Sequence, residues 1–460
     1  MKTEQSKMKQ GLFLAVFGSE KRSFAALFAR TAVVTLCLVT VACGGSDKKE
    51  SAKKDSIWGS GDESTDTALS DLSAETQRKW KHAKELFIQY EKEGWSDSAC
   101  SSTSSAFEDA SSSRKGGFAE ALFMAGLSKE RCGDSDDAKD FYEKTLSLNP
   151  KFCKARVGIG VMQMREGKRS DALVTFSNAI KDDARCTEGY VNLATLQRDS
   201  ARTSEQYKEA LDNLRRGLAI DANYLPAFNQ MALLYLDLAK KDKKLLDLAE
   251  VVCRQAQQIN DKYAPIYNTW GQINLAQDKI IEAAAKFRYA TELDPKFFEA
   301  YMNFGEITLS YRGYDDAKAA FEKAALLRSN SYDAHLGLGA ALRGLKQFDA
   351  AEKSYKQAQE LDSRRPESYF NLGVLYQNYK GGSIDDFSKA KDYFEEFLDK
   401  AKSGGQFAES VDEVRRRCQT SSSRRKRKGG KSECQPGRLQ NIEQALAGLR
   451  EAAKMQSGGN

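Results

Sequence analysis

Apolar and small residues recur along the chain from Phe118 onward with a period of about 34 residues. Each period has two parts, and in both parts the spacings are three and four, which place the residues on one side of a helix. The clearest copy consists of Tyr267, Trp270, Gly271, Ala283, Phe287 and Ala290. The pattern therefore predicts a chain of helix pairs.

Small residues in this pattern have a packing role. Gly271, Ala283 and Ala290 would let two antiparallel helices approach closely, while Phe287 would fill the space that remains. Pro295 cannot continue a helix and suits the start of the next one, so it would separate one helix pair from the following pair.

These residues resemble the signature of the tetratricopeptide repeat, and eight consecutive copies cover residues 118–400. The small residue of the first helix recurs in all eight copies, as Gly126, Gly160, Ala194, Ala232, Gly271, Gly305, Gly339 and Gly373. The resemblance implies an all-α superhelical solenoid of about eight helix-turn-helix repeats. Three copies carry extra residues between their helices, at 200–204, 240–244 and 379–383.

Both flanks of the repeats contain helical patterns. Trp80, Ala83 and Phe87 predict a helix near residues 75–93, and a Ser-rich segment then extends towards residue 113. We interpret residues 75–117 as an N-terminal helical region, with the Ser-rich segment as the second helix of a degenerate repeat. Residues 438–456 predict a C-terminal cap helix through Leu439, Ile442, Leu446 and Leu449. The alternative is a detached amphipathic helix.

The first 42 residues have the pattern of a secretory signal. Basic residues precede an apolar run at 31–42, which is shorter than the roughly 20 residues needed to cross a bilayer. The run ends in Thr40-Val41-Ala42-Cys43, which resembles the lipobox of bacterial lipoproteins, although Thr40 departs from the usual apolar residue. The resemblance implies lipidation of Cys43 and a mature chain that begins there. The alternative is a buried helix that ends near an unrelated cysteine.

Residues 43–74 are mostly Ser, Lys, Asp, Gly and Glu. They contain too few apolar side chains to offset the entropy of ordering, so we expect a flexible tether. Gly44 follows the cysteine. Enterobacterial lipoproteins that are retained in the inner membrane carry Asp at this position instead. The expectation is therefore an outer-membrane lipoprotein that faces the periplasm.

The formal net charge is only +6, and most of the excess lies in residues 401–437, which we expect to form a basic flexible loop. Behind a lipobox, this loop favours anionic lipid headgroups, lipopolysaccharide or an acidic partner over nucleic acid. A solvated linker is the alternative. The basic residues are Arg415, Arg416, Arg417, Arg424, Arg425, Lys426, Arg427 and Lys428.

Six cysteines of the expected mature chain fall at helix ends or in irregular segments. Because the periplasm oxidises thiols, we expect the pairs Cys100–Cys132, Cys153–Cys186 and Cys418–Cys434. Cys253 takes the buried aromatic position of the fourth repeat and should remain a free thiol. Reduced cysteines that serve only in packing are the alternative.

Motifs for catalysis are missing from the sequence. Two histidines occur, and no phosphate-binding glycine loop, serine elbow or zinc-like cysteine spacing accompanies them. His335 takes a large-residue position of the seventh repeat, where packing is the expected role. We therefore expect neither enzyme activity nor a cofactor or metal.

The resemblance implies that the first helices of the repeats line a concave, peptide-binding groove. Asparagines recur there just before an apolar–small pair, and an amide can both donate to and accept from a peptide backbone. The expected groove residues are Asn192, Asn229, Asn268, Met302, Asn303, Glu306, Arg343, Phe370, Asn371, Gln377 and Asn378.

The expected function is that of a lipid-anchored scaffold that binds envelope proteins or peptides. The architecture is similar to the tetratricopeptide lipoprotein of the gliding-motility machinery in myxobacteria-like organisms. A pilotin-like assembly factor for a type IV pilus secretin is one alternative. An accessory factor of a cell-wall or glycosyl-transfer enzyme is an alternative of another class.

Overall fold

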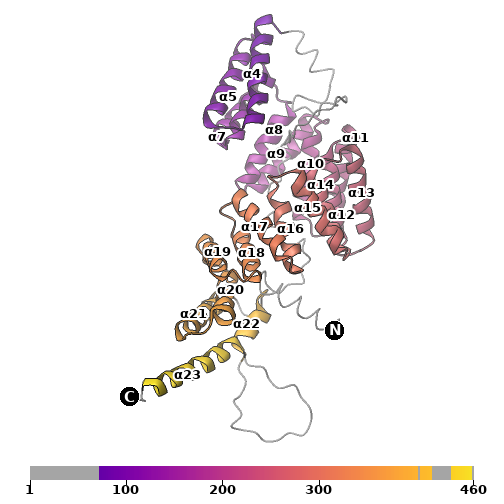
Figure 1. Cartoon of the computed structure of the whole chain (residues 1–460). Coiled ribbons are helices and arrows are strands. Elements are labelled where there is room, and N and C mark those ends of the chain that lie inside the picture. Colours follow the sequence, from indigo (N-terminus) through magenta and orange to yellow (C-terminus); the bar gives the residue numbers. More distant parts are fainter. Residues whose placement is uncertain (1–71, 402–404, 417–436, 458–460) are drawn as a thin grey trace. The chain divides into compact units, whose positions relative to one another are not determined.

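The computed structural model describes residues 72–401, 405–416 and 437–457, and every regular element in these residues is helical (Figure 1). The chain divides into two compact units, with the boundary between Thr269 and Trp270 inside helix α14 (Ala264–Ala276). The all-α solenoid class expected from the sequence is therefore confirmed.

The N-terminal unit contains five helix pairs before α14. In each pair the two helices pack against each other. The pairs are α4 (Ala74–Glu93) with α5 (Asp97–Ser112), α6 (Ala119–Arg131) with α7 (Ser135–Leu148), α8 (Cys153–Arg165) with α9 (Arg169–Asp182), α10 (Thr187–Ser200) with α11 (Ser204–Ile220), and α12 (Leu225–Leu238) with α13 (Leu245–Ile259).

The C-terminal unit continues the same arrangement from α14 and ends with two further helices. Its elements are α15 (Ile280–Leu293), α16 (Phe298–Ser310), α17 (Tyr314–Leu327), α18 (Tyr332–Gly344), α19 (Phe348–Leu361), α20 (Glu367–Leu375), the π-helix η1 (Tyr376–Lys380), α21 (Ile384–Lys400), α22 (Ala408–Arg415) and α23 (Arg438–Ser457).

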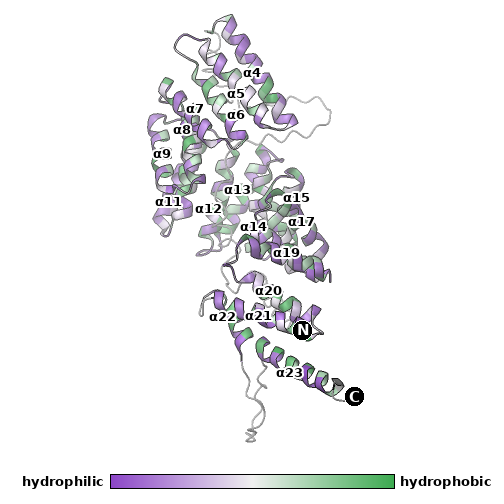
Figure 2. Ribbon diagram, turned by 90° about the vertical axis from the view of Figure 1, so that its left-hand side faces the viewer, coloured by the Kyte–Doolittle hydropathy of each residue, from purple (hydrophilic) through white to green (hydrophobic). Residues whose placement is uncertain are grey.

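Apolar residues lie on one side of most helices and polar residues on the other (Figure 2). Ala283, Phe287 and Ala290 of α15 are at most 1% exposed. A Cβ atom at Gly271 would lie 2.5 Å from the ring of Phe287, so only glycine permits this contact. Among the described residues, none of the helices combines the length and the apolar composition that crossing a membrane requires.

The turns inside five helix pairs share one backbone conformation. Gly133 and Gly167 have φ angles of 78° and 77°, and Asp278, Arg312 and Lys346 have 60°, 64° and 62° at the equivalent place. The 34-residue repeat is visible in this turn, since 312 and 346 are one period apart. Left-handed conformation suits glycine, so three repeats hold larger side chains at a less favourable position.

The N-terminal flank forms a complete helix pair, α4 and α5. Ser73 caps α4 by accepting a hydrogen bond from the backbone of Thr76, and Leu72 is buried beside Phe118. The expected tether at 43–74 therefore extends too far towards the C-terminus, because Leu72, Ser73 and Ala74 belong to the folded region. The remainder of that tether lies outside the described residues.

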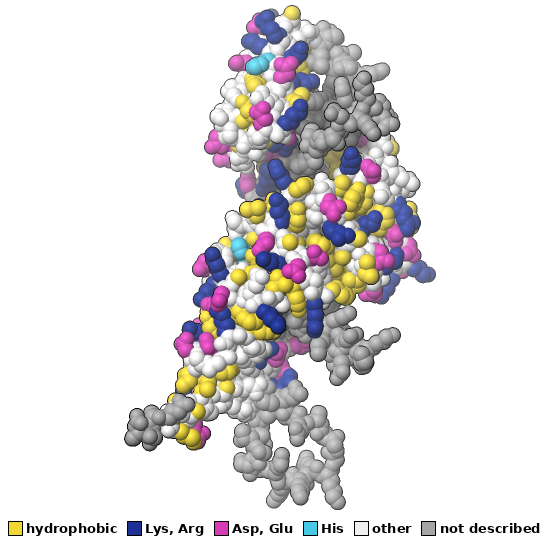
Figure 3. Space-filling view, in the orientation of Figure 1, with side chains coloured by type: hydrophobic (Ala, Val, Ile, Leu, Met, Phe, Trp, Pro, Cys, Tyr) yellow, Lys and Arg dark blue, Asp and Glu magenta, His cyan; other side chains and the backbone are white. Residues whose placement is uncertain are grey.

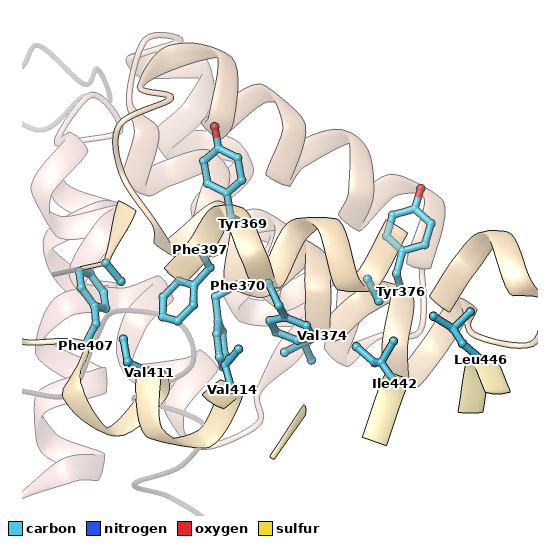
Figure 4. Close-up of a cluster of buried hydrophobic side chains, with 13 residues drawn as sticks. Tyr369, Phe370, Val374, Tyr376, Phe397, Phe407, Val411, Val414, Ile442 and Leu446 are labelled. Carbon is cyan, nitrogen blue, oxygen red and sulfur yellow. The ribbon is translucent and has the colours of Figure 1, made fainter. Parts of the chain in front are cut away.

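The C-terminal flank differs from the expected basic loop at 401–437. Helix α22 forms within it, with Val411 and Val414 buried against Phe370 and Phe397 (Figure 4). The spacing of three between the valines places both on one face of a helix. Two apolar residues followed by a basic run are too few to predict this helix from sequence.

Helix α23 completes the end of the C-terminal unit by packing on α21. Its Ile442 and Leu446 are buried in the same hydrophobic cluster as α22, with Leu439 partly buried beside them (Figure 4). Covering the apolar face of the final repeat is what a solenoid cap does, because a terminal repeat has no following neighbour.

Candidate partner-binding face

Nine of the eleven expected groove residues lie in the first helices of their pairs, and Gln377 and Asn378 lie in η1; we call the surface of these helices the first-helix face. Three of the eleven reach the surface: Asn192 and Gln377 are half-buried, and Asn378 is exposed. The remaining eight are buried, namely Asn229, Asn268, Met302, Asn303, Glu306, Arg343, Phe370 and Asn371.

Asn371 is fully enclosed and hydrogen-bonded within the protein. Its Oδ1 accepts a hydrogen bond from Nη1 of Arg343 at 3.0 Å, and its Nδ2 donates to the carbonyl of Glu367 at 2.9 Å. The first of these bonds joins α18 to α20, at two residues where the sequence led us to expect ligand contacts.

The N-terminal unit contains two links of the same kind. Thr269 donates to Oδ1 of Asn229 at 2.7 Å, which joins α14 to α12. Arg198 donates from Nη1 to Oε1 of Gln230 at 2.7 Å, which joins α10 to α12. Asn229 is thus another residue that was expected to face a partner and instead connects neighbouring repeats.

Gln230 and Thr269 were not identified from the sequence, although a signal for them exists. Both precede an apolar–small pair, as Asn192, Asn303 and Asn371 do. The same repeat position therefore carries a polar residue in five repeats. In three of the five that residue bonds to the first helix of the preceding repeat. The pattern is better read as a line of links between repeats than as a set of ligand contacts.

Asn192 and Phe370 also differ from the expectation. Asn192 donates from Nδ2 to the carbonyl of Glu188 in its own helix at 2.8 Å. Phe370 is 3% exposed, and its ring lies 5.2 Å from that of Phe397. The end of the chain covers Phe370, which a sequence read repeat by repeat does not reveal.

The half-buried Gln377 also contacts the C-terminal helix. Its Oε1 accepts a hydrogen bond from Nη1 of Arg438 at 2.8 Å, and Arg438 pairs with Glu413 of α22 at 2.6 Å. Asn378 is left as the one expected groove residue that is exposed in the described part of the chain.

A charged network joins α18 to α20 beside these residues. Arg365 donates to Asp333 at 2.8 Å and to Glu367 at 3.0 Å, and its guanidinium lies 3.8 Å from the ring centre of Tyr332. The Tyr332 hydroxyl in turn accepts from the backbone N–H of Ser368 at 2.9 Å. Burial would lower the pKa of Arg365, but Asp333 and Glu367 outweigh it, so that pKa is raised.

Glu306 of α16 has a different environment. It is 5% exposed, and within the described residues nothing donates a hydrogen bond or forms an ion pair with its carboxylate. Burial, together with the negative charge of Asp333, raises its pKa well above the ordinary value of 4.5. Met302 and Asn303, one turn earlier in α16, are buried as well.

Two disulfides close the first repeats of the N-terminal unit. Cys100 of α5 bonds to Cys132 at the end of α6, and Cys153 of α8 bonds to Cys186 at the start of α10, with Cα atoms 6.4 and 5.5 Å apart. These are the pairs expected from the sequence. Cys253 is buried and belongs to neither disulfide, and Cys418, Cys434 and Cys43 lie outside the described residues.

One group of side chains has the arrangement of a metal site. The donor atoms of Cys153, Cys186 and Glu188 lie within 4.8 Å of one another. The two sulfurs are bonded to each other, and a disulfide lacks the thiolate that binds zinc. As it stands, the group is a structural cross-link, and only reduction would turn it into a set of metal ligands.

The expected basic surface is described only at its beginning. Arg415 and Arg416 are exposed at the end of α22, and Arg416 pairs with Asp412 of the same helix. Arg417, Arg424, Arg425, Lys426, Arg427 and Lys428 lie outside the described residues. The space-filling view shows Lys and Arg intermixed with Asp and Glu over the visible described surface (Figure 3).

Comparison with known proteins identifies the repeat. Residues 119–152 and 312–366 each match a family described as tetratricopeptide repeat. No curated protein sequence matches the chain.

Solved structures with a similar fold include three bacterial proteins. The tetratricopeptide protein TTC0263 of Thermus thermophilus shares 23% identity, covering 42% of this chain and 99% of its own, with a TM-score of 0.38. The Pseudomonas aeruginosa protein pilF shares 21%, covering 50% and 97%, with a TM-score of 0.39. A Parabacteroides merdae tetratricopeptide protein shares 16%, covering 56% and 98%, with a TM-score of 0.39.

Both family matches fall on helices of the array, α6–α7 and α17–α19, within the stretch where the repeat signature recurs in the sequence. The chain is a tetratricopeptide repeat protein.

Proposed function

We propose that this chain is a lipid-anchored scaffold outside the cytoplasm that binds a protein partner through its repeats. Tetratricopeptide repeats bind partner proteins or peptides, so the repeats support the role of an interaction scaffold. The more specific part of the proposal concerns the compartment, the anchor and the surface that the partner contacts.

The disulfides Cys100–Cys132 and Cys153–Cys186 are the main support for a location outside the cytoplasm. Disulfides persist in the periplasm and at cell surfaces but are rare in the bacterial cytosol. The sequence before Cys43 resembles a lipoprotein signal, which delivers a protein to the same side of the membrane. Two independent features of the chain thus favour the periplasm.

We place the protein at the outer membrane, facing the periplasm, because Gly44 follows Cys43. A role in an envelope machine of the gliding-motility kind fits a long repeat array on a lipid anchor.

A variant with Cys43→Ala tests the anchor, and Cys253→Ala is the matched control because Cys253 is buried and belongs to neither disulfide. We expect radiolabelled palmitate to mark the parent and the control but not Cys43→Ala, which should leave the membrane fraction. Equal labelling and equal fractionation of all three proteins would refute the anchor.

The scaffold role itself is tested by purifying the tagged, full-length parent from its native envelope after mild crosslinking. We expect at least one envelope protein to co-purify in stoichiometric amount with the parent. Recovery of the tagged chain alone under these conditions would contradict the scaffold proposal.

A further inference from the structure

Glu306 has a buried carboxylate with no donor of its own. Across the described residues no Lys, Arg or polar hydrogen reaches it, and only 5% of the residue is exposed. Burying an unpaired carboxylate is costly, and proteins usually pair such groups or replace them by neutral ones. The position is therefore suited to a cation that arrives with a partner.

In the described part of the chain, the charge that acts on Glu306 is the negative charge of Asp333, which cannot pair with a carboxylate. Helices α15, α17 and α18 pack on α16. Burial, together with the negative charge of Asp333 on α18, raises the pKa of Glu306. Arg365, the cation next to Asp333, is already held by Asp333 and Glu367 at 2.8 and 3.0 Å.

Apolar and polar side chains share the side of α16 that carries Glu306: Met302 and Leu309 are apolar, and Asn303 and Ser310, three residues before it and four after it, are polar. Met302 lies four residues before it and Leu309 three residues after it, so both share its side of α16. Both are 4% exposed. Long cationic side chains bury their aliphatic stems on apolar surface and place the charged head at the end. A Lys or Arg side chain has an aliphatic stem that could pack on Met302 and Leu309 and a positive charge that could pair with Glu306. A bare metal ion would need more oxygen ligands.

We infer that Glu306, with Asp333 beside it, receives a Lys or Arg side chain of the protein partner on the first-helix face of α16 and α18. This inference rests on the proposed scaffold function and narrows its partner to one with a basic side chain at the contact. Because burial and Asp333 raise the pKa of Glu306, we expect its carboxylic acid to release a proton to solvent when the carboxylate pairs with the incoming cation.

Proton release distinguishes this site from an ordinary acidic surface, whose carboxylates are already ionised. The probe is an acetylated, amidated nonapeptide of alternating arginine and alanine, and the reference peptide has citrulline in place of each arginine. Titration calorimetry in two buffers of different ionisation enthalpy measures the protons released. We expect the parent to release up to one proton per arginine peptide, and to bind the citrulline peptide at least tenfold more weakly.

The test variant is Glu306→Gln, and the matched control is Glu322→Gln, which removes an exposed carboxylate of α17. We expect Glu306→Gln to weaken arginine-peptide binding roughly tenfold and to abolish proton release, while Glu322→Gln changes neither. Circular dichroism verifies the helical fold of both variants. Binding by the parent without proton release, no binding by the parent, or unchanged binding by a folded Glu306→Gln would each overturn the inference.

Failure of this inference is distinguishable from failure of the scaffold proposal. If the native partner still co-purifies with Glu306→Gln as it does with the parent, the basic contact at Glu306 is wrong and the scaffold role stands. If no partner co-purifies with the parent itself, the scaffold proposal fails.

Discussion

Arg343 and Asn371 are both buried, and the guanidinium of the first donates to the amide oxygen of the second at 3.0 Å. The bond joins the first helices of two successive repeats. Similar bonds join Arg198 to Gln230 and Thr269 to Asn229. Since each repeat of a solenoid contacts only its neighbours, such links contribute directly to the cohesion of the array.

Replacing Asn371 should therefore destabilise the fold. Asn371→Ala leaves the buried guanidinium of Arg343 without this acceptor, and we expect the free energy of unfolding to fall by about 1–3 kcal/mol. Asn192→Ala is the control, because its amide bonds only to its own helix and is half-buried. Its expected change is below about 1 kcal/mol. Urea unfolding of both variants measures the difference, and equal loss in the two would contradict a linking role.

Gly271 tests the close approach of paired helices. A Cβ atom there would lie 2.5 Å from the ring of Phe287, so Gly271→Ala should lower the free energy of unfolding by about 1–3 kcal/mol. At Gly448 of α23 a Cβ meets nothing within 4 Å, and Gly448→Ala should be neutral or stabilising by about 0.5–1 kcal/mol. Thermal unfolding compares the two, and a stabilising Gly271→Ala would show that the contact is not tight.

In the shared turn, introducing a glycine should stabilise the fold and removing one should destabilise it. Lys346 is exposed with a φ of 62°, so Lys346→Gly should raise the free energy of unfolding by roughly 0.5–1 kcal/mol. Gly133 has a φ of 78° and space for a Cβ, so Gly133→Ala should lower it by about 1 kcal/mol through the backbone alone. Chemical denaturation of both variants decides this. Changes of the same sign would contradict the account of the turn.

Glu352 predicts a dependence of stability on pH. Burial alone would raise its pKa, but hydrogen bonds from Lys356, Lys380 and Tyr376 outweigh burial and lower that pKa to about 2. Because the folded pKa lies below the ordinary 4.5, Glu352 stabilises the fold above pH 4.5, and this contribution disappears as the pH falls towards 2.

Glu352→Gln should consequently lower the free energy of unfolding by roughly 1–3 kcal/mol at pH 7 and have little effect near pH 2. The exposed Glu322→Gln serves as the control and should give a small difference that varies little with pH. Unfolding curves between pH 2 and 7 test this, and an effect of Glu352→Gln that is constant across the range would refute the assignment.

The ends of the basic segment support the third cysteine pair. The backbone N–H of Gly437 donates to the carbonyl of Arg416 at 2.7 Å, which holds these two residues together. In the sequence, Cys418 is two positions after Arg416 and Cys434 three positions before Gly437, few enough for the chain to let the two cysteines pair. We predict that they form a disulfide. A peptide map without reductant should contain the linked pair, and separate alkylation of both cysteines would contradict it.

The repeat fold could be predicted from sequence because it depends on contacts between residues close in the chain. Gly271 and Phe287 are sixteen positions apart, and their types recur along the array. Cys153 and Cys186, which form a disulfide, likewise stand at nearly equivalent places in adjacent repeats, 33 positions apart.

The contacts of the expected groove residues could not be predicted from the repeat pattern. Whether Asn371 faces a partner or a neighbour depends on Arg343, which stands in another repeat and carries no signature of its own. Phe370 is covered by α22 and α23, which lie outside the repeat pattern. The environment of Glu306 depends on neighbouring helices, which a spacing pattern does not describe.

The measurement that tests the account most directly is a mass-spectrometric peptide map of the protein isolated from its native envelope without reductant. We expect an acylated N-terminal peptide that begins at Cys43 and linked peptides for Cys100–Cys132 and Cys153–Cys186. An unmodified chain that extends upstream of Cys43, with Cys100, Cys132, Cys153 and Cys186 all alkylated, would contradict it.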